Sequence, residues 1–283
     1  MVNARVMHPL CGVTICICLC ISTVTRAQMH GFSFSLADSM PLLAQHIYVD
    51  PFGNRYWISP QGIFFKQDIH TDSLYQYSNW NTGIPEQADV SNPLQVLLFY
   101  PLSARIYFLS RWLTPLHVLD LKSQGILQPT AVALSYDNQI WVFDLQDGML
   151  KKISRDGRLL LQSVPFSQLV HRLFRPTRII DSRQQLYLYD PRLGIAVCDE
   201  LANFQTFLPV SSSRSFAAAG KNLYVLRNDS VLLFRPPFGL LAGMHLPAYM
   251  QPREIAAGSG DSHLLLLGTR ALYILQLSEV SNN

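Results

Sequence analysis

The stretch IWVFDLQDGMLKKISRDGRLL, residues 140–160, decides the fold because it contains strands separated by tight turns. Residues 140–143 form a short apolar run with two aromatics, which predicts a strand buried on both faces. Asp147 and Gly148 then supply a turn, since Asp bonds to nearby backbone and Gly adopts positive φ without steric cost. A second strand is expected over residues 149–153, and Gly157 closes it with another turn. The predicted unit is therefore strand, turn, strand, turn, strand.

The same unit recurs along the chain. Its second strands are expected at RYWIS from Arg55, IYFLS from Ile106, IWVFD from Ile140, LYLYD from Leu186, LYVLR from Leu223 and LLLLG from Leu264. Successive start positions differ by 51, 34, 46, 37 and 41 residues. A repeat of roughly 40 residues with four short strands is typical of a β-propeller blade. We therefore expect an all-β fold, a six-bladed β-propeller of four-stranded antiparallel blades.

A proline precedes the expected innermost strand in four copies. These are NPLQ from Asn92, QPTA from Gln128, RPTR from Arg175 and QPRE from Gln251. Pro lacks an amide donor and so suits the first position of a strand. With these marks the chain resembles the NHL and TolB-like six-bladed propellers, best in QPTAVALSYDNQIWVFD and RPTRIIDSRQQLYLYD. The stretch DVSNPLQVLLFYP is also similar to uncharacterised exported propeller-like proteins of Bacteroidota. Both resemblances imply a fold and carry no activity.

The first 27 residues have the character of an export signal. Arg5 precedes an apolar run over residues 11–24, and Ala27 fits a signal-peptidase site. The run is shorter than the roughly 20 residues that a membrane-spanning helix needs. We expect cleavage after Ala27, a periplasmic or exported product, and one propeller domain over residues 28–283. The alternative is an outer-membrane lipoprotein anchored at Cys20, although a bulky leucine precedes that cysteine.

Charge and cysteine content narrow the function classes. Removing residues 1–27 removes two Arg and no acid, which lowers the net charge from +3 to +1. Nucleic-acid binding relies on clustered excess positive charge, so we expect none. Cys198 is the one cysteine outside the signal, within the apolar stretch GIAVCDE. A free cysteine there usually behaves as a small buried hydrophobe, and a redox or ligand role is the alternative.

The sequence contains no catalytic or cofactor motif that we recognise. The histidines show no HxH, HxxxH or HExxH spacing, and no GxSxG or phosphate-binding Gly loop occurs. Glutamates are too few for the carboxylate-rich metal site of six-bladed lactonases. Recurring aspartates flank the expected second strands, where turn bonding explains them: Asp50, Asp120, Asp137, Asp144, Asp181 and Asp190. We expect no enzyme activity, metal or cofactor; a small-ligand receptor or lactonase-like hydrolase at the channel mouth is the alternative.

One group of charged residues remains as a candidate site. Arg178, Arg214, Arg253 and Glu254 each stand where an innermost strand is expected to begin, so a closed ring would gather them around one mouth of the central channel. Arg binds carboxylates and phosphates well. The group would therefore bind an anion or a partner's acidic side chain, unless its members pair with one another and with loop carbonyls.

Nearby loops are expected to extend this site with Arg and apolar side chains. The residues concerned are Arg172, Arg175, Trp112, Leu113, Phe174, Phe238 and Tyr249. Exposed aromatics with Arg are the usual anchors of protein interfaces, and packing beneath longer loops is the alternative. We predict a non-enzymatic periplasmic interaction module. Its expected partners are cell-envelope proteins associated with the outer membrane, and peripheral attachment of the module to a membrane is compatible with this prediction.

The last blade is expected to be one strand short. Three strands, REIAAG, HLLLLG and ALYILQL, are followed by a short polar tail. The segment GFSFSLA, residues 31–37, alternates Phe32, Phe34 and Leu36 with small residues and belongs to no blade of its own. We expect this N-terminal strand to pair outside ALYILQL and close the ring. The alternative is a loose N-terminal arm.

Overall fold

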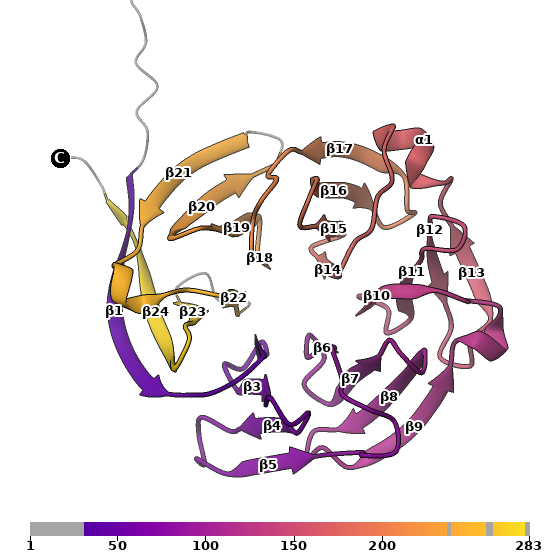
Figure 1. Cartoon of the computed structure of the whole chain (residues 1–283), viewed down its shortest axis with the longest axis horizontal. Helices are drawn as coiled ribbons and strands as arrows, with labels where there is room; N and C mark the ends of the chain where they lie inside the picture. Colours follow the sequence, from indigo (N-terminus) through magenta and orange to yellow (C-terminus); the bar gives the residue numbers. More distant parts are fainter. Residues whose placement is uncertain (1–30, 237–238, 259–262, 281–283) are drawn as a thin grey trace, which may run out of the picture.

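Six four-stranded antiparallel sheets stand around a central axis and form a six-bladed β-propeller (Figure 1). This computed structural model describes residues 31–236, 239–258 and 263–280. The predicted signal peptide, Cys20 and Phe238 lie outside the described residues. The predicted fold class is confirmed, and blade 3 has the strands and tight turns predicted from residues 140–160.

The blades follow one another along the chain. Blade 1 contains β2 (His46–Val49), β3 (Arg55–Ile58), β4 (Phe64–Gln67) and β5 (Leu74–Tyr77), and blade 2 contains β6 (Gln87–Asp89), β7 (Gln95–Tyr100), β8 (Arg105–Ser110) and β9 (Pro115–Asp120). Blade 3 contains β10 (Pro129–Leu134), β11 (Ile140–Asp144), β12 (Met149–Ile153) and β13 (Leu159–Gln162), and blade 4 contains β14 (Arg178–Ser182), β15 (Gln185–Asp190), β16 (Gly194–Asp199) and β17 (Phe204–Leu208). Blade 5 contains β18 (Ser215–Ala219), β19 (Asn222–Arg227), β20 (Ser230–Arg235) and β21 (Gly239–His245). Blade 6 contains β22 (Glu254–Ala257), β23 (His263–Leu267) and β24 (Ala271–Val280), with β1 (Gly31–Pro41) as its outer strand.

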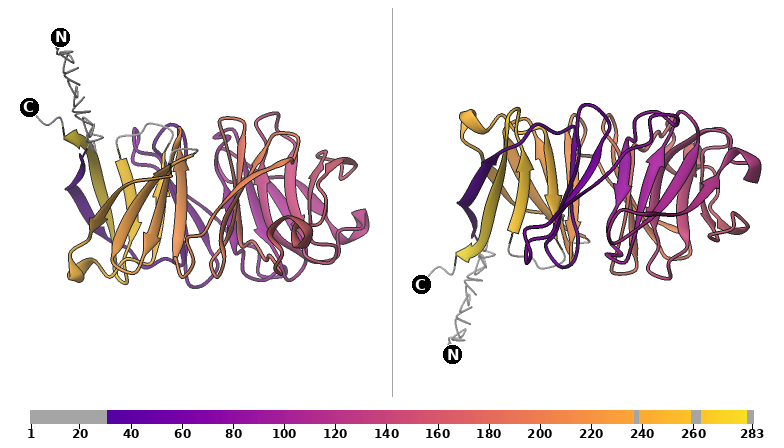
Figure 2. Two further views of the ribbon diagram at one scale, coloured as in Figure 1. Left: turned by 90° about the horizontal axis from the view of Figure 1, so that it is seen from above. Right: turned by 90° about the horizontal axis from the view of Figure 1, so that it is seen from below.

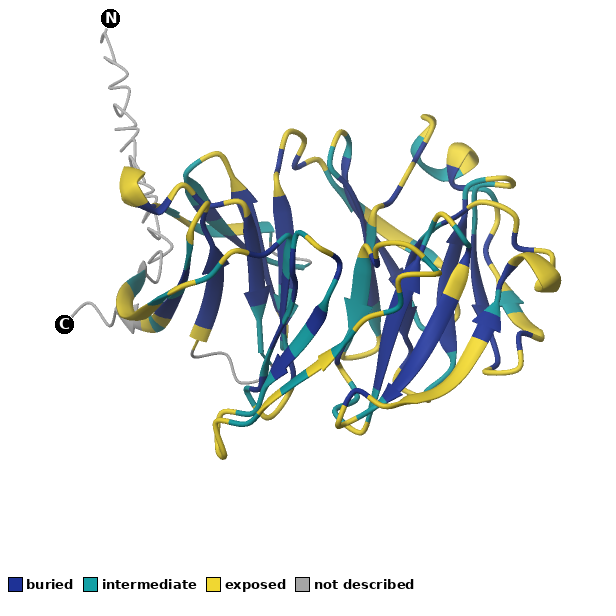
Figure 3. Cartoon of the chain, turned by 60° about the horizontal axis from the view of Figure 1, so that its bottom comes forward, coloured by how far each residue is buried: buried dark blue, intermediate teal, exposed yellow. Residues whose placement is uncertain are grey.

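The apolar core lies between neighbouring blades. Every residue of β11 is buried, as its continuous apolar run predicts, and Phe99 and Phe108 of blade 2 pack with Val142 of blade 3. The central strands are dark blue in Figure 3, whereas several outermost strands and most loops are yellow. Burial on both faces therefore explains why the second strands are uniformly hydrophobic.

Blade 2 differs from the sequence prediction. The stretch IYFLS belongs to β8, the third strand, and the second strand is β7. Pro93 consequently lies between β6 and β7 instead of before an innermost strand. The innermost strand β6 has only three residues, all partly exposed, so it shows no apolar pattern.

The N-terminal strand closes the ring as predicted. β1 pairs antiparallel with β24, with Phe34 opposite Leu277 and Leu36 opposite Leu275 (Figures 1 and 2). Phe34 packs against the core of blades 5 and 6, but Leu36 is 46% exposed beside a register shift that ends at Asp38. The expected apolar face of this strand is therefore interrupted.

Helical structure within the described residues is limited to three short segments. They are η1 (Lys122–Gln124), α1 (Phe166–Val170) and η2 (Ala248–Met250). No helix in this part of the chain has the length and apolar character needed to cross a membrane.

Candidate functional site at the channel mouths

The innermost strands begin around one cavity at the end of the central channel. This cavity, here called the entry mouth, has a volume of about 380 Å³. Its walls include a residue from the start of each innermost strand: His46, Gln87, Thr130, Arg178, Ser215 and Glu254. The six strands therefore run in the same direction along the channel, and their first residues share one site.

The four charged residues predicted to meet at a channel mouth do so. Arg178, Arg214, Arg253 and Glu254 all line the entry mouth. Arg214 and Arg253 are exposed, and Nη1 of Arg214 donates to the carbonyl oxygen of Pro252 at 2.9 Å. This bond holds the Arg214 guanidinium beside the backbone that carries Arg253. Within the described residues, neither arginine has a carboxylate within ion-pair distance.

A second charged group lies deeper in the entry mouth. The Glu254 carboxylate contacts two partners, with Oε2 3.2 Å from Nδ1 of His46 and Oε1 3.5 Å from Nη1 of Arg178. The Arg178 guanidinium also donates to the carbonyl oxygen of Phe216 at 3.3 Å and lies over the rings of Tyr48 and Phe216. Arg178 and Glu254 thus follow the alternative expectation that members of the group pair with one another. Arg214 follows the other half of that alternative, because it bonds to the loop carbonyl of Pro252.

Gln87 spans the entry mouth and joins three blades. Its side-chain amide donates at 2.8 Å to the carbonyl oxygens of Thr130 and Thr177, in blade 3 and just before blade 4. Its Oε1 accepts a bond from the backbone N–H of Val132 at 3.1 Å. With donors and acceptor all engaged, this side chain fixes the relative positions of blades 2, 3 and 4 around the cavity.

The charged groups that line the entry mouth carry a net positive charge. Burial raises the pKa of Tyr48, with a further contribution from the charge of Glu254, and burial also raises the pKa of Tyr189. Both phenols are therefore neutral at pH 7. Three arginines outnumber the two glutamates of the cavity lining, Glu86 and Glu254, so these five groups together carry a charge of +1. An exposed pair of guanidinium groups in a half-enclosed cavity is suited to carboxylate or phosphate.

The opposite end of the channel has a different character. This exit mouth is a cavity of about 270 Å³ with a wall of small residues from β18 and β22, among them Ala217 and Ala256. Its charged lining residues are Asp89, Asp181, Arg178 and Arg183. Across the described residues, no group of three or more His, Cys, Asp or Glu side chains is placed to hold a metal ion.

Asp181 is the exception among the aspartates assigned to turns. It lies inside β14 and accepts bonds from the neighbouring blade, from the backbone N–H of Tyr136 and from Nε1 of Trp141. Burial raises its pKa. The other five accept backbone N–H bonds at turns as predicted: Asp50 from Phe52, Asp120 from Ser123, Asp137 from Gln139, Asp144 from Gln146 and Asp190 from Arg192.

The predicted apolar rim of the entry mouth does not include Trp112, Leu113 or Phe174, and the burial of Leu113 and Phe174 follows the alternative of packing beneath loops. Phe174 is 2% exposed and packs in an aromatic cluster with Phe143 and Phe166, and Leu113 is also buried. Trp112 is exposed, but its turn follows Ser110, which pairs with Gln95 at the exit end of blade 2. The misplaced strand of blade 2 put this turn on the wrong face.

The remaining predicted rim residues lie on the entry side. Tyr249 is 63% exposed in η2, just before β22. Arg172 and Arg175 are exposed in the segment that leads to β14. None of these three side chains is part of the cavity lining, so the arginines of the entry mouth itself are Arg178, Arg214 and Arg253.

His46 and Gln87 are the site residues that sequence reasoning missed. They occupy the same position in β2 and β6 that Arg178 and Glu254 occupy in β14 and β22. A proline stands two residues before β14 and β22, but Ala44 occupies that position before β2, and blade 2 was assigned the wrong phase. Strand position in a correctly phased repeat is the signal that would have found both.

Comparison with known proteins supports the fold. No protein-family profile matches the sequence, and no curated protein matches it significantly. The structure is similar to streptogramin B lyase, with 14% identity over 82% of this chain and 78% of that one, TM-score 0.60. It is similar to virginiamycin B lyase from Staphylococcus aureus, with 12% identity over 89% and 90% of the two chains, TM-score 0.60. The β-propeller domain of Cps50 (Swd1) from Myceliophteria thermophila shares 10% identity over 87% and 100%, TM-score 0.62. At such identities the likeness concerns the fold alone.

Proposed function

We propose that this protein is a non-enzymatic interaction module that binds an acidic group of a protein partner at the entry mouth. The observation that carries the proposal is the exposed pair Arg214 and Arg253, which has no carboxylate partner within the described residues. Arg is among the residue types that dominate interface energies, and its planar fork binds carboxylates with two parallel bonds. An acidic side chain or a chain terminus fits this geometry.

The surface around the entry mouth supports a macromolecular partner. Large apolar side chains stand exposed on the loops at this end of several blades: Leu43, Trp80, Leu102, Leu173 and Tyr249. Leu102 is 82% exposed and Trp80 is 72% exposed. Apolar and aromatic anchors around a charged centre are the usual composition of a protein interface. The same proposal includes four predictions from the sequence. They are export, an envelope location, a partner associated with the outer membrane, and membership of the NHL/TolB-like subclass of propellers.

Capture of partners with matched variants tests the proposal. Wild-type protein and the double variant Arg214→Gln/Arg253→Gln would be used as bait in detergent extracts of the cells that make the protein, with quantitative mass spectrometry as readout. Arg270→Gln is the control, because Arg270 is exposed in the turn between β23 and β24 at the same end of blade 6 but outside the cavity lining.

We expect the wild type and the Arg270→Gln variant to enrich the same envelope proteins. The double variant should enrich these proteins at least about tenfold less. If the double variant captures the same proteins at the same level, the entry mouth is not the interface. Recovery of the wild type alone under gentle conditions would contradict an interaction role altogether.

A small-ligand receptor or hydrolase is the second candidate. It is favoured by the contact of His46 with Glu254, since a carboxylate that orients an imidazole is a common arrangement for proton transfer. The test is acid release from a panel of lactones by wild type and His46→Gln. Turnover by the wild type that disappears in the variant would establish this candidate, and equal rates in both would reject His46 as its base.

A further inference from the structure

We propose that protonation of His46 controls anion binding at the entry mouth, so that acidic groups bind more tightly as the pH falls from 8 to 5.5. This inference rests on the proposed function, because it concerns regulation of the same cavity. The observation behind it is that one carboxylate, Glu254, contacts both the imidazole of His46 and the guanidinium of Arg178.

The contact defines where the additional proton goes. A carboxylate only accepts hydrogen bonds, so Nδ1 of His46 must carry the hydrogen that faces Oε2 of Glu254. The nitrogen that gains a proton is therefore Nε2. Protonation gives a side chain that is 37% exposed and lines the cavity both a second N–H donor and a full positive charge.

The positive charge that a protonated His46 adds is large relative to the charge of the other groups that line the cavity. The charged groups that line it with His46 come from four other blades: Glu86 before β6, Arg178 in β14, Arg214 before β18, and Arg253 with Glu254 at β22. The titratable phenols are Tyr48 in the same strand and Tyr189, both held neutral by burial. Three arginines against two glutamates give +1, and a protonated His46 raises this to +2.

Protonation also changes how Glu254 is shared. The His46 contact is 3.2 Å and becomes an ion pair, whereas the Arg178 contact is 3.5 Å and at the limit of a hydrogen bond. A carboxylate drawn toward the imidazolium neutralises the guanidinium less. Arg178 is 22% exposed on its side chain, so a ligand in the cavity would find it more available at low pH.

Histidine is suited to this role because its side chain changes charge between pH 5 and 8, whereas carboxylates and guanidinium groups keep theirs. The probe for the test is a tetramethylrhodamine-labelled hexaglutamate peptide, whose carboxylates stay largely ionised above pH 5.5. Its fluorescence anisotropy would be titrated with protein from pH 5.5 to 8.0 at constant ionic strength, because salt screens such contacts.

Three variants separate the possible outcomes. His46→Gln keeps a donor for Glu254 but cannot gain a charge. His70→Gln is the control, because His70 is exposed in the turn between β4 and β5, outside the cavity lining. Arg214→Gln/Arg253→Gln tests the site itself. Melting curves at each pH identify any variant that is not folded, and His46→Asn then replaces His46→Gln.

We expect the wild type and His70→Gln to bind hexaglutamate about fivefold more tightly at pH 5.5 than at pH 8. His46→Gln should bind within about twofold across the range, and calorimetry at pH 6.5 should show proton uptake on binding by the wild type but not by this variant. If His46→Gln keeps the pH dependence of the wild type, the inference is wrong although the proposed function stands. If the double arginine variant binds as tightly as the wild type, or the wild type does not bind, the proposed function itself fails.

Discussion

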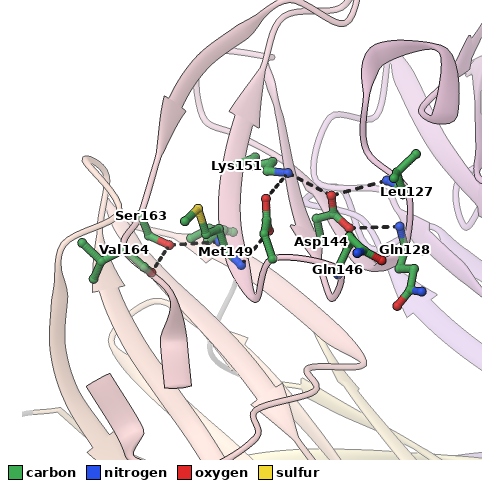
Figure 4. Close-up of polar contacts among 10 residues, drawn as sticks. Leu127, Gln128, Asp144, Gln146, Met149, Lys151, Ser163 and Val164 are labelled. Carbon is green, nitrogen blue, oxygen red and sulfur yellow. Dashed lines mark hydrogen bonds and ion pairs between the residues drawn. The ribbon is translucent and has the colours of Figure 1, made fainter. Parts of the chain in front are cut away.

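At the scale of single residues, an aspartate at the end of a blade's second strand accepts a hydrogen bond from the segment that leads into the innermost strand of the same blade. Asp144 accepts a bond from the backbone N–H of Gln128 at 2.9 Å and an ion pair from Nζ of Lys151 (Figure 4). In blade 4, Asp190 is fully buried and accepts from the N–H of Arg175 at 2.8 Å. Asp144 and Asp190 therefore each link the entering segment of their blade to its second strand.

Asp144→Asn should destabilise the protein by about 3 kcal/mol, because it leaves the buried Lys151 without one of its partners. Asp147→Asn is the comparison: Asp147 also pairs with Lys151 but is far more exposed, so we expect a loss of about 1 kcal/mol. Chemical unfolding at pH 7 measures both. Equal losses would show that the burial of Asp144 does not determine its contribution.

The contribution of Asp144 should depend on pH in the acid range. Burial alone would raise its pKa, but bonds from Lys151 and the backbone outweigh burial and hold it below its usual value. A carboxyl group whose pKa is lower in the folded state than in the unfolded state, where it is about 3.9, stabilises the folded protein at pH values above about 3.9. This stabilisation is lost as the pH falls through the pKa of the folded state. The difference in stability between wild type and Asp144→Asn should therefore narrow below about pH 4. Unfolding curves from pH 7 to pH 2.5 would reveal a constant difference if the pair does not titrate.

Cys198 should be unreactive in the folded protein. Its side chain is fully buried in the core between blades 3 and 4, and burial, with the nearby charge of Asp199, raises its pKa to about 12. The predicted role of a small buried hydrophobe is confirmed for its location. In a chain that starts at Gln28, Ellman's reagent at pH 8 should label the thiol only after unfolding; rapid labelling under native conditions would contradict this.

At the scale of elements, the start of β16 depends on a glycine. Gly194 has φ +136°, and a Cβ placed on it would lie 2.1 Å from the carbonyl oxygen of Leu208 in β17. Gly148, in the corresponding turn of blade 3, has φ +69° and open space around it. Gly194→Ala should cost about 3 kcal/mol or more, and Gly148→Ala only about 1 kcal/mol. Similar melting temperatures for the two variants would mean that β17 moves away without cost.

The blades could be predicted from the sequence wherever two conditions hold together. The second strand must be a buried apolar run, and a turn with Asp or Gly must precede or follow it, as at β11 and β15. Blade 2 fails because β7 and β8 are both apolar and buried, so either fits the second position. Its short β6 gives no signal, because its residues face the channel and bond to other blades, as Asp89 does to the N–H of Leu134.

The candidate site was predictable in part for the same reason. Arg178, Arg214 and Glu254 belong to blades whose phase the sequence marks with a proline or a strong strand, and they meet as expected. The strand position of His46 could have assigned it to the site, but its contact with Glu254 could not be predicted, since it joins residues 208 positions apart in sequence. Such a contact follows only from the closed ring, which places blade 1 against blade 6.

At the scale of the whole molecule, blade 6 is completed by two strands from distant parts of the sequence, β1 and β24. Ten residue pairs join β1 to β24, from Gly31 opposite Val280 to Pro41 opposite Ala271. Without β1, the outer edge of β24 would present unpaired backbone groups, which is an aggregation hazard. The blade that β1 completes also supplies Arg253 and Glu254 to the entry mouth.

A chain that begins at Leu42 should therefore lose a few kcal/mol and melt about 10 °C lower than one that begins at Gln28. A peptide of residues 31–41 added in trans should restore part of this loss in a concentration-dependent way, because it binds only the folded ring. Within the intact chain, Phe34→Asp should cost about 2 kcal/mol since Phe34 packs on the core, whereas Leu36→Asp should change stability by less than about 0.5 kcal/mol since Leu36 is exposed. Differential scanning calorimetry measures the melting temperature of each of these samples. An unchanged melting temperature on removal of β1 would mean that the other strands hold the ring without it, and the contact between His46 and Glu254 would then owe nothing to the N-terminal strand.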